Sequence, residues 1–254
     1  MQSAELRKKL KRVATSEMIP LIGFTNAERW TEYHETGQDF YPQSIWPWCR
    51  TVIVLGVPIF LPILESSPSV IYSELDMTAR RVLDAAAYKF SCLLNKMGHR
   101  THYLSCNGYL NISELLNTQE AAFSHVLAAK YAGLGTIGMS HSFLTKEFGP
   151  RVRLVSVITD AYIKPDSVMT ENLCTKCGQC ISRCPMQVFK SQEDDSIAEM
   201  DKLHCAEHQQ SANGQRYPCG ICTAVCPVGE DRILYGKSSV STEGIEHVRS
   251  FGAK

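Results

Sequence analysis

The chain has 254 residues, of which 44% are hydrophobic, and its 26 basic residues balance 26 acidic ones. This content suffices for one large domain, or for a domain of about 150 residues with a smaller appendage. Because proteins that neutralise many phosphates show a basic excess, the zero net charge gives no support to nucleic-acid binding. Eleven cysteines outside a secretory context point to metal or redox chemistry rather than to disulfides.

No segment of the sequence has the features of a targeting signal. Residues 1–13 are charged and predict a surface helix, because they lack the apolar core of a secretory signal. The longest apolar stretch, residues 52–64, contains Gly56, Pro58 and Pro62 and is too short to span a bilayer. We therefore expect a cytoplasmic protein.

Residues 1–165 alternate between helical and strand-like apolar patterns, which predicts an α/β (α+β) layered domain. Helices are expected at 71–97 and 119–132, each stopped by a glycine. The expected strands are short apolar runs bounded by turn residues, at 19–24, 52–59, 101–105 and 151–159.

After residue 165 the apolar density falls, and a cysteine motif occurs twice. The first copy has the spacing C-x2-C-x2-C-x3-C-P and consists of Cys174, Cys177, Cys180 and Cys184. The second copy has a longer first spacer and consists of Cys205, Cys219, Cys222 and Cys226. We expect residues 166–232 to form a ferredoxin-like domain, followed by a tail at 233–254.

This spacing is the one by which bacterial ferredoxins hold two [4Fe–4S] clusters, with each fourth cysteine serving the other cluster. One predicted ligand set is therefore Cys174, Cys177, Cys180 and Cys226. The other is Cys184, Cys205, Cys219 and Cys222. The alternative is a pair of zinc sites, but zinc motifs rarely carry a three-cysteine run ending in Cys-Pro, and here that ending occurs twice.

The other three cysteines are expected to be small buried hydrophobes, as free cysteines usually are. Cys92 lies on or near the apolar face of the long helix, and Cys49 precedes a buried strand. Only Cys106, in the loop after the strand at 101–105, is retained as a weak site candidate.

Residues 133–138 match G-x-G-x-x-G, which binds dinucleotides only between a strand and a following helix. Here a helix precedes the glycines, so that interpretation fails. The alternative is a helix C-cap at Gly133 followed by a tight turn. Three glycines in six residues exceed the needs of a cap and indicate backbone pressed against something large and flat.

Several segments share a known pattern: Ala-Gly-Leu-Gly-Thr-Ile-Gly at 132–138, Phe148-Gly-Pro-Arg-Val-Arg-Leu, Thr159-Asp160 and the double cysteine motif. They resemble the epoxyqueuosine reductase family, which is related to the reductive dehalogenases. The resemblance covers about residues 19–229. It implies a nitroreductase-like, cobalamin-binding domain and clusters that deliver electrons to cobalt. It also implies that the glycine loop approaches the corrin ring. The cofactor-binding candidates are His125, Gly133, Leu134, Gly135, Ile137, Gly138, Met139, Ser140 and His141.

The chain departs from the family pattern at several points. Met139 stands where the family usually has a lysine, and the family's catalytic Arg-Asp-Tyr-His stretch is not intact near residues 72–76. Tyr72 and Asp76 are the catalytic candidates, with Asp84 as a rival. The alternative makes each a solvated residue on the polar side of a helix. The tRNA-associated helical repeats of full-length members and the export signal of respiratory dehalogenases are both missing, so a short form is expected.

Three functions remain open. The first is a cobalamin-dependent reductase of a small electrophile, supplied with electrons by a ferredoxin or flavodoxin. The second is a non-catalytic electron carrier for a partner such as a corrinoid protein, docking at the insertion 206–218 with its His208, Gln209, Gln210 and Arg216. That insertion is alternatively a plain surface loop. The third and weakest is epoxyqueuosine reduction on tRNA by a truncated form.

Overall fold

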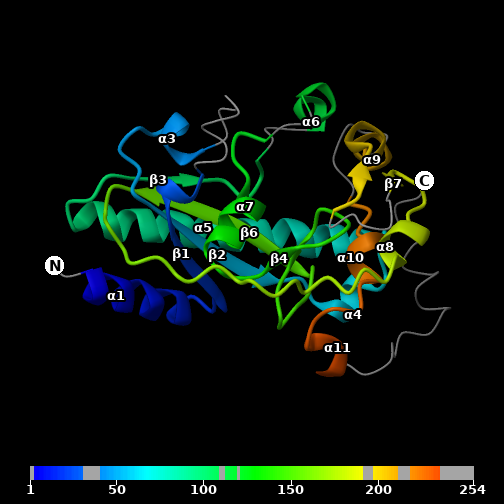
Figure 1. Cartoon of the computed structure of the whole chain (residues 1–254), viewed down its shortest axis with the longest axis horizontal. Coiled ribbons are helices and arrows are strands. Elements are labelled where there is room, and N and C mark those ends of the chain that lie inside the picture. Colours follow the sequence, from blue (N-terminus) through cyan, green and yellow to red (C-terminus); the bar gives the residue numbers. More distant parts are fainter. Residues whose placement is uncertain are drawn as a thin grey trace.

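The computed structural model describes residues 3–30, 41–108, 112–118, 121–190, 197–210 and 218–234. A four-stranded antiparallel sheet forms its centre, and helices cover both faces. The cysteine-bearing segments gather at one end of the molecule, opposite the end where the chain starts (Figure 1). The α/β fold class expected from the sequence is confirmed.

The sheet has the strand order β1-β2-β6-β3, and all neighbouring strands are antiparallel. Its two central strands are almost entirely buried, which explains why they are continuous apolar runs rather than alternating ones. All four strands expected from the sequence are confirmed: β1 (Leu21–Asn26), β2 (Thr51–Pro58), β3 (Thr101–Leu104) and β6 (Val152–Thr159).

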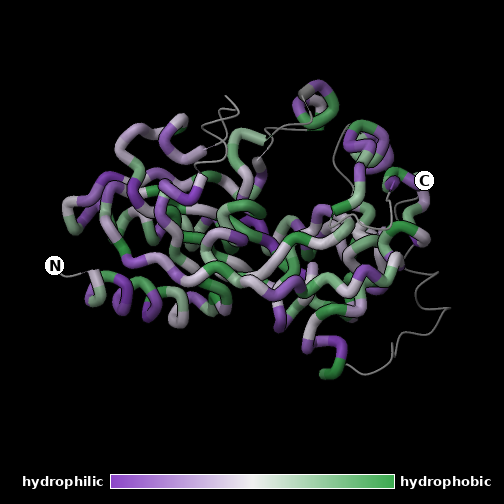
Figure 2. The backbone as a smooth tube through the Cα atoms, viewed as in Figure 1, coloured by the Kyte–Doolittle hydropathy of each residue, from purple (hydrophilic) through white to green (hydrophobic). Residues whose placement is uncertain are grey.

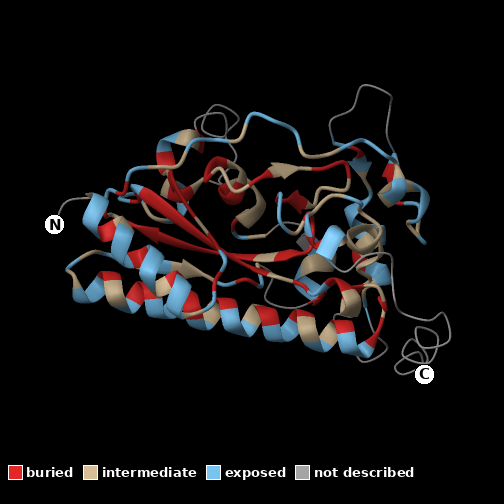
Figure 3. Ribbon diagram, turned by 90° about the horizontal axis from the view of Figure 1, so that it is seen from below, coloured by how far each residue is buried: buried red, intermediate tan, exposed pale blue. Residues whose placement is uncertain are grey.

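Two hydrophobic cores lie on opposite faces of the sheet. Helices α1 (Ser3–Ser16) and α5 (Val70–Lys96) cover one face, and α7 (His125–Tyr131) covers the other. Successive side chains of β2 alternate between the two cores, so that Ile53 packs under α5 and Val54 packs under α7. Figure 3 shows α1 and α5 side by side, with their buried stripes towards the sheet.

Helix α5 begins and ends as its sequence predicts. The Ser69 side chain accepts a hydrogen bond from the Tyr72 N–H at 3.1 Å, and Gly98 follows the helix with a φ of 85°. The expectation that Cys92 is buried is wrong, because Cys92 lies on the exposed side of this helix. Cys49 and Cys106 are buried as expected.

The two other expected helices are also present, with different lengths. Helix α1 buries Leu6, Leu10 and Ala14 and exposes most of its charged residues, and Figure 2 shows hydrophilic and hydrophobic positions alternating along it. The helix expected at 119–132 is shorter: α7 begins at His125, where the Ser124 side chain accepts from the Leu127 N–H. Of the helices in the described ranges, none combines the length and the apolar character needed to cross a membrane.

The internal repeat of the cysteine motif is visible in the backbone. Gly178 and Gly220 each follow a cysteine, adopt φ near 70°, and start the four-residue helices α8 (Gln179–Ser182) and α10 (Ile221–Ala224). These two helices pack against each other. The remaining elements are short: η1 (Ala27–Trp30), α3 (Pro42–Ile45), α4 (Leu61–Leu64), α6 (Ile112–Thr118), β4 (Thr136–Ile137), β5 (Phe143–Leu144), β7 (Phe189–Lys190), β8 (Glu199–Met200), α9 (Lys202–His208) and α11 (Asp231–Leu234).

Candidate active site and cluster-binding cysteines

The four cysteines of the first predicted ligand set lie together. One small pocket is lined by Cys174, Cys177, Cys180 and Cys226. Burial raises the pKa of the Cys226 thiol, and its neighbours Cys177 and Cys174 raise it further. The sequence interval between Cys180 and Cys226 is long, so only the fold brings these residues together.

The second group shows the same mutual electrostatic influence. Burial raises the pKa of Cys219, with Cys205 and Cys184 as further causes. Burial likewise raises the pKa of Cys222 to about 12, with further contributions from Cys219 and Cys205. Cys180 of the first predicted set also raises the pKa of Cys222, so the two sets lie close together, and the exchange of fourth ligands stays a prediction.

The chemistry of these thiols fits an iron–sulfur group. Raised pKa values mean that four neighbouring thiolates are unfavourable without a compensating positive charge, and metal binding supplies that charge. Within the described ranges, no three histidine, cysteine or acidic side chains are arranged to hold a metal ion directly. The assignment of two ligand sets therefore rests on the pocket and on the thiol neighbours.

The glycine loop packs against the chain itself. A Cβ at Gly133 would overlap the carbonyl oxygen of Ser167, and one at Gly135 would overlap that of Leu144. The sequence predicted that these glycines press against something large and flat. At Gly133 and Gly135 the neighbour is instead the backbone of the chain itself. A Cβ at Gly138 would come within 3.6 Å of the Cys174 sulfur, so the end of the loop lies beside the first cysteine group.

The predicted cofactor-binding residues of the loop separate into three environments. Leu134 packs in the core under α7, and Ile137 belongs to β4. The pocket of the first cysteine group is lined also by Gly138, Met139 and Ser140. His141 Nε2 lies 2.6 Å from the carbonyl oxygen of Ala198, so the loop contacts the segment between the two cysteine motifs.

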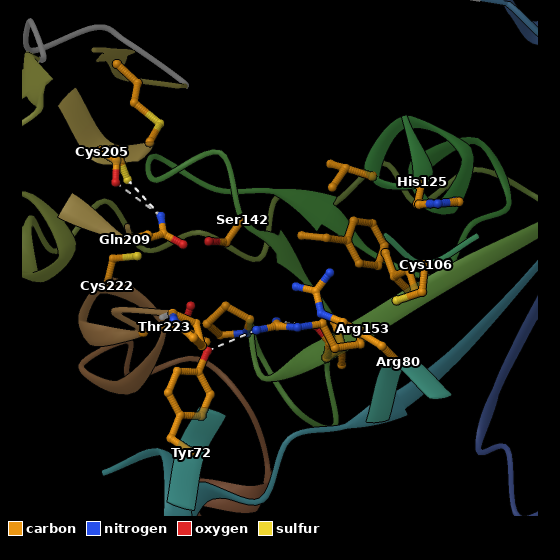
Figure 4. A pocket seen from close by; sticks show the side chains of 18 residues that line it. Tyr72, Arg80, Cys106, His125, Ser142, Arg153, Cys205, Gln209, Cys222 and Thr223 are labelled. Carbon is orange, nitrogen blue, oxygen red and sulfur yellow. Dashed lines mark hydrogen bonds between the residues drawn. The ribbon is translucent and has the colours of Figure 1, made fainter. Parts of the chain in front are cut away.

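A larger pocket of about 350 Å³ lies between the α/β domain and the second cysteine group (Figure 4). Cys205 and Cys222 lie on one side of it, and Arg80 and Arg153 lie on another. Apolar side chains of β6, of the turn just before it, of α7 and of β5 complete the walls, namely Val152, Leu154, Pro150, Val126 and Phe143.

Tyr72 and Asp76 lie at this pocket in a network with two arginines. Tyr72 lines the pocket, and its oxygen is 2.9 Å from Arg153 Nη2. Asp76 is 3% exposed and forms ion pairs with Arg80, at 2.8 Å, and with Arg153. The alternative that both are solvated residues on the polar side of a helix is wrong, because both side chains are buried.

The environment of Arg153 keeps it charged. Burial alone would lower its pKa, but Tyr72 and Asp76 together raise it above the ordinary arginine value. Asp76, which accepts from two guanidinium groups, is held as a carboxylate. Sequence reasoning missed both arginines, although Arg80 follows Asp76 at the i+4 spacing and Arg153 lies in the Phe148-Gly-Pro-Arg-Val-Arg-Leu segment.

The far end of the pocket is formed by His125 and by the loop after β3. His125 Nδ1 lies 2.9 Å from Ser156 Oγ, its Nε2 lies 2.9 Å from the Ser105 carbonyl oxygen, and burial lowers its pKa. Cys106 lines the same pocket, and burial raises the pKa of its thiol to about 11. Asp84, the rival acid, instead accepts from the Cys106 N–H at 2.7 Å and does not line the pocket.

The insertion at 206–218 contributes to this site. Gln209 and Pro218 line the pocket, and Gln209 Nε2 donates to the Cys205 carbonyl oxygen at 3.3 Å. Residues 211–217, with Arg216, lie outside the described residues. The described ends of the insertion thus form part of the pocket wall.

The sequence comparison finds two groups of relatives, while no protein-family model matches the chain. A tetrachloroethene reductive dehalogenase of Desulfitobacterium hafniense is 27% identical over 195 residues, which cover 70% of this chain and 32% of that protein. An epoxyqueuosine reductase of Bacillus anthracis is 29% identical over 125 residues, covering 46% of this chain and 32% of that protein. The chain thus spans about a third of the length of these curated relatives.

Solved structures of the same two groups share the fold. A catabolic reductive dehalogenase in complex with 3-bromo-4-hydroxybenzoic acid has a TM-score of 0.69 at 18% identity, covering 95% of this chain and 35% of that one. An epoxyqueuosine reductase with a modified tRNA stem loop has a TM-score of 0.62 at 16% identity, covering 99% of this chain and 77% of that one. The chain is therefore a relative of the reductive dehalogenases and the epoxyqueuosine reductases, as its motifs indicate.

Proposed function

We propose that the chain is a cobalamin-dependent iron–sulfur reductase of a small electrophile. One observation carries this proposal: the pocket of about 350 Å³ has a tyrosine–arginine network on one wall and Cys205 and Cys222, two of the predicted cluster ligands, on another. A site with this layout places an electron source and a proton source around the same space. One of the related structures is described as a B12-dependent dehalogenase.

The cysteines would hold the redox groups in the two sets that the spacing predicts. When bound, the clusters supply single electrons, and a corrinoid supplies a cobalt centre that can reduce an electrophile. The described walls enclose a volume at the lower end of the range for drug-sized ligands, about 300–1,000 Å³. A corrinoid is larger than such ligands, so part of it would extend beyond this volume.

The side chains of the arginine wall have separate roles in the proposed reaction. Tyr72 is the proton donor, because its hydroxyl lies in the pocket and Arg153 stabilises the negative charge left on its oxygen. Asp76 positions both arginines and, as an ion-paired carboxylate, does not itself supply the proton. This assignment retains one of the two acids expected from the sequence and gives the other a positioning role.

The test is metal analysis of the anaerobically purified chain together with its absorbance during addition of hydroxocobalamin. We expect about eight irons per chain, the content of two cubane clusters, and a saturable spectral change with one cobalt retained. A chain that retains no cobalt and shows no spectral change would exclude the reductase.

A second candidate, the electron carrier, is favoured by one observation: Cys177 is exposed, so the first cysteine group reaches the surface. In the reductase the same exposed edge would receive electrons from a ferredoxin or flavodoxin. A pull-down under reducing conditions separates the two proposals, because stoichiometric capture of a corrinoid protein, with no cobalt in the chain itself, would support the carrier.

The related structure with a tRNA stem loop favours a third candidate, reduction of epoxyqueuosine on tRNA. The balance of 26 basic and 26 acidic residues weighs against it. A gel-shift titration with the tRNA at low salt tests this candidate, and an absence of any shift would remove it.

A further inference from the structure

The pocket presents positive charge to its interior. Among the residues that the structure describes, its lining includes two arginines, Arg80 and Arg153, and no aspartate or glutamate. The carboxylates nearest to these arginines lie behind the lining: Asp76 is ion-paired with both of them, and Asp84 accepts from Ser105 Oγ and from the Cys106 N–H.

The two arginines differ in how much of their hydrogen-bonding capacity the protein uses. Arg153 donates from Nε to Asp76, from Nη1 to the Val152 carbonyl oxygen and from Nη2 to Tyr72. Arg80 donates from Nε to Asp76 at 2.8 Å, and its two terminal nitrogens have no hydrogen-bond partner among the described residues. The Arg80 side chain is 17% exposed and lines the pocket, so a ligand in the pocket can reach these donors.

The position of Arg80 is fixed by the helix that carries it. Tyr72, Asp76 and Arg80 are spaced four residues apart on α5 and so form one row along its surface. Figure 4 shows Arg80 and Arg153 beside each other on the wall between Tyr72 and Cys106. Two terminal N–H groups of a guanidinium held in this way match the geometry of a carboxylate or phosphate.

The geometry points to Arg80 as an oxyanion-binding residue, so that the ligand of this pocket carries a carboxylate, phosphate or comparable anionic group at the arginine wall. This inference deepens the proposed function, on which it rests for the identity of the ligand as a substrate. The opposite wall carries Cys205 and Cys222, which are anionic as cluster ligands, so the anionic group of the ligand faces away from them.

Two sources could supply such an oxyanion: a substrate with a carboxylate, or the phosphodiester in the nucleotide tail of a corrinoid. The experiment uses two small probes of the same shape, benzoate and its neutral counterpart benzamide. Their binding to the anaerobic, cluster-loaded chain is measured by calorimetry, so the readout does not depend on turnover. A parallel titration with hydroxocobalamin distinguishes the two sources.

We expect benzoate to bind about tenfold or more tightly than benzamide, because hydrogen bonds to a charged group are stronger than those to a neutral one. Arg80→Gln should abolish this preference, and Arg80→Lys should retain part of it. The matched control is Arg81→Gln, which removes the same charge from the exposed side of α5 and should leave the preference unchanged. Unfolding curves of all variants check that each remains folded.

The hydroxocobalamin arm assigns the source of the oxyanion. Unchanged cobalamin affinity in Arg80→Gln supports a substrate oxyanion, whereas a tenfold loss supports the phosphodiester of the cofactor. Equal affinities of the wild-type chain for benzoate and benzamide would overturn the inference, as would a preference for benzoate that survives in Arg80→Gln. If the wild-type chain prefers benzoate but binds no cobalamin, the oxyanion site stands and the proposed reductase fails.

Discussion

Arg151 and Asp231 form a buried ion pair that fastens the segment carrying Cys226 to the start of β6. Arg151 Nε and Nη2 each lie 2.6 Å from one carboxylate oxygen of Asp231, and the Arg151 side chain is completely buried. The same guanidinium donates to the carbonyl oxygens of Cys226, at 3.1 Å, and of Val228, at 2.5 Å. Loss of the pair should therefore affect both stability and the first cysteine group.

We predict that Asp231→Ala lowers the free energy of unfolding by about 3–5 kcal/mol, the usual cost of leaving one member of a buried pair without its partner. Because the Arg151 side chain is completely buried, most of this penalty should appear. Because the freed guanidinium no longer fixes the Cys226 carbonyl, we also expect less iron to be retained by the first cysteine group.

The assay is anaerobic urea unfolding of the chain, with iron per chain measured before denaturant is added. Glu230→Ala is the matched control, because Glu230 is exposed and the hydrogen bonds given for it involve only its backbone, which the substitution leaves in place. The double variant Arg151→Met, Asp231→Leu removes both charges and should recover much of the loss. An Asp231→Ala effect no larger than that of Glu230→Ala would refute this reasoning.

Three further predictions concern the site. Tyr72→Phe should lower turnover about 10²–10⁴-fold while leaving cobalamin affinity unchanged, since a general acid acts in the transition state. Unchanged turnover would show that Tyr72 is not the proton donor. Cys222→Ser should lower the iron content from about eight to roughly four per chain, because only one cubane loses a ligand; an unchanged iron content would contradict the ligand assignment. Burial lowers the pKa of His125 in the folded state, so as the pH falls the unfolded state takes up a proton at a higher pH than the folded state does. Stability should therefore fall as the pH drops below about 6.5. His125→Gln should flatten that slope in urea unfolding at several pH values, and an identical slope in the variant would count against the burial argument.

The long-range fold could be predicted from the sequence where the apolar pattern is strong. The strands β2 and β6 are continuous apolar runs, and α5 has a helical face, a capping serine and a terminal glycine, so their bounds were predicted within two residues. The bounds of α6, α7 and α9 were not predicted, because a seven-residue helix carries too few apolar positions to fix its ends.

The candidate site could be predicted only in part. Tyr72 and Asp76 were selected from their position near a family motif, and both are at the pocket. Arg80 and Arg153 were missed because arginines on a helix or strand are usually solvated, and nothing in the sequence places β6 beside α5. The glycine loop was expected to meet a flat ligand, whereas Gly133 and Gly135 make room for the carbonyl oxygens of Ser167 and Leu144.

The sequence by itself predicted iron–sulfur chemistry, because cysteine spacing is a local property that can be recognised without any tertiary information. The same spacing predicted that Cys226 joins the first set and Cys184 the second. Only the tertiary structure decided what these cysteines face. Strand β6 and helix α5 carry Arg153 and Arg80 to a pocket that shares a wall with Cys205 and Cys222. Such a meeting depends on the packing of segments distant in sequence, and local patterns do not encode it.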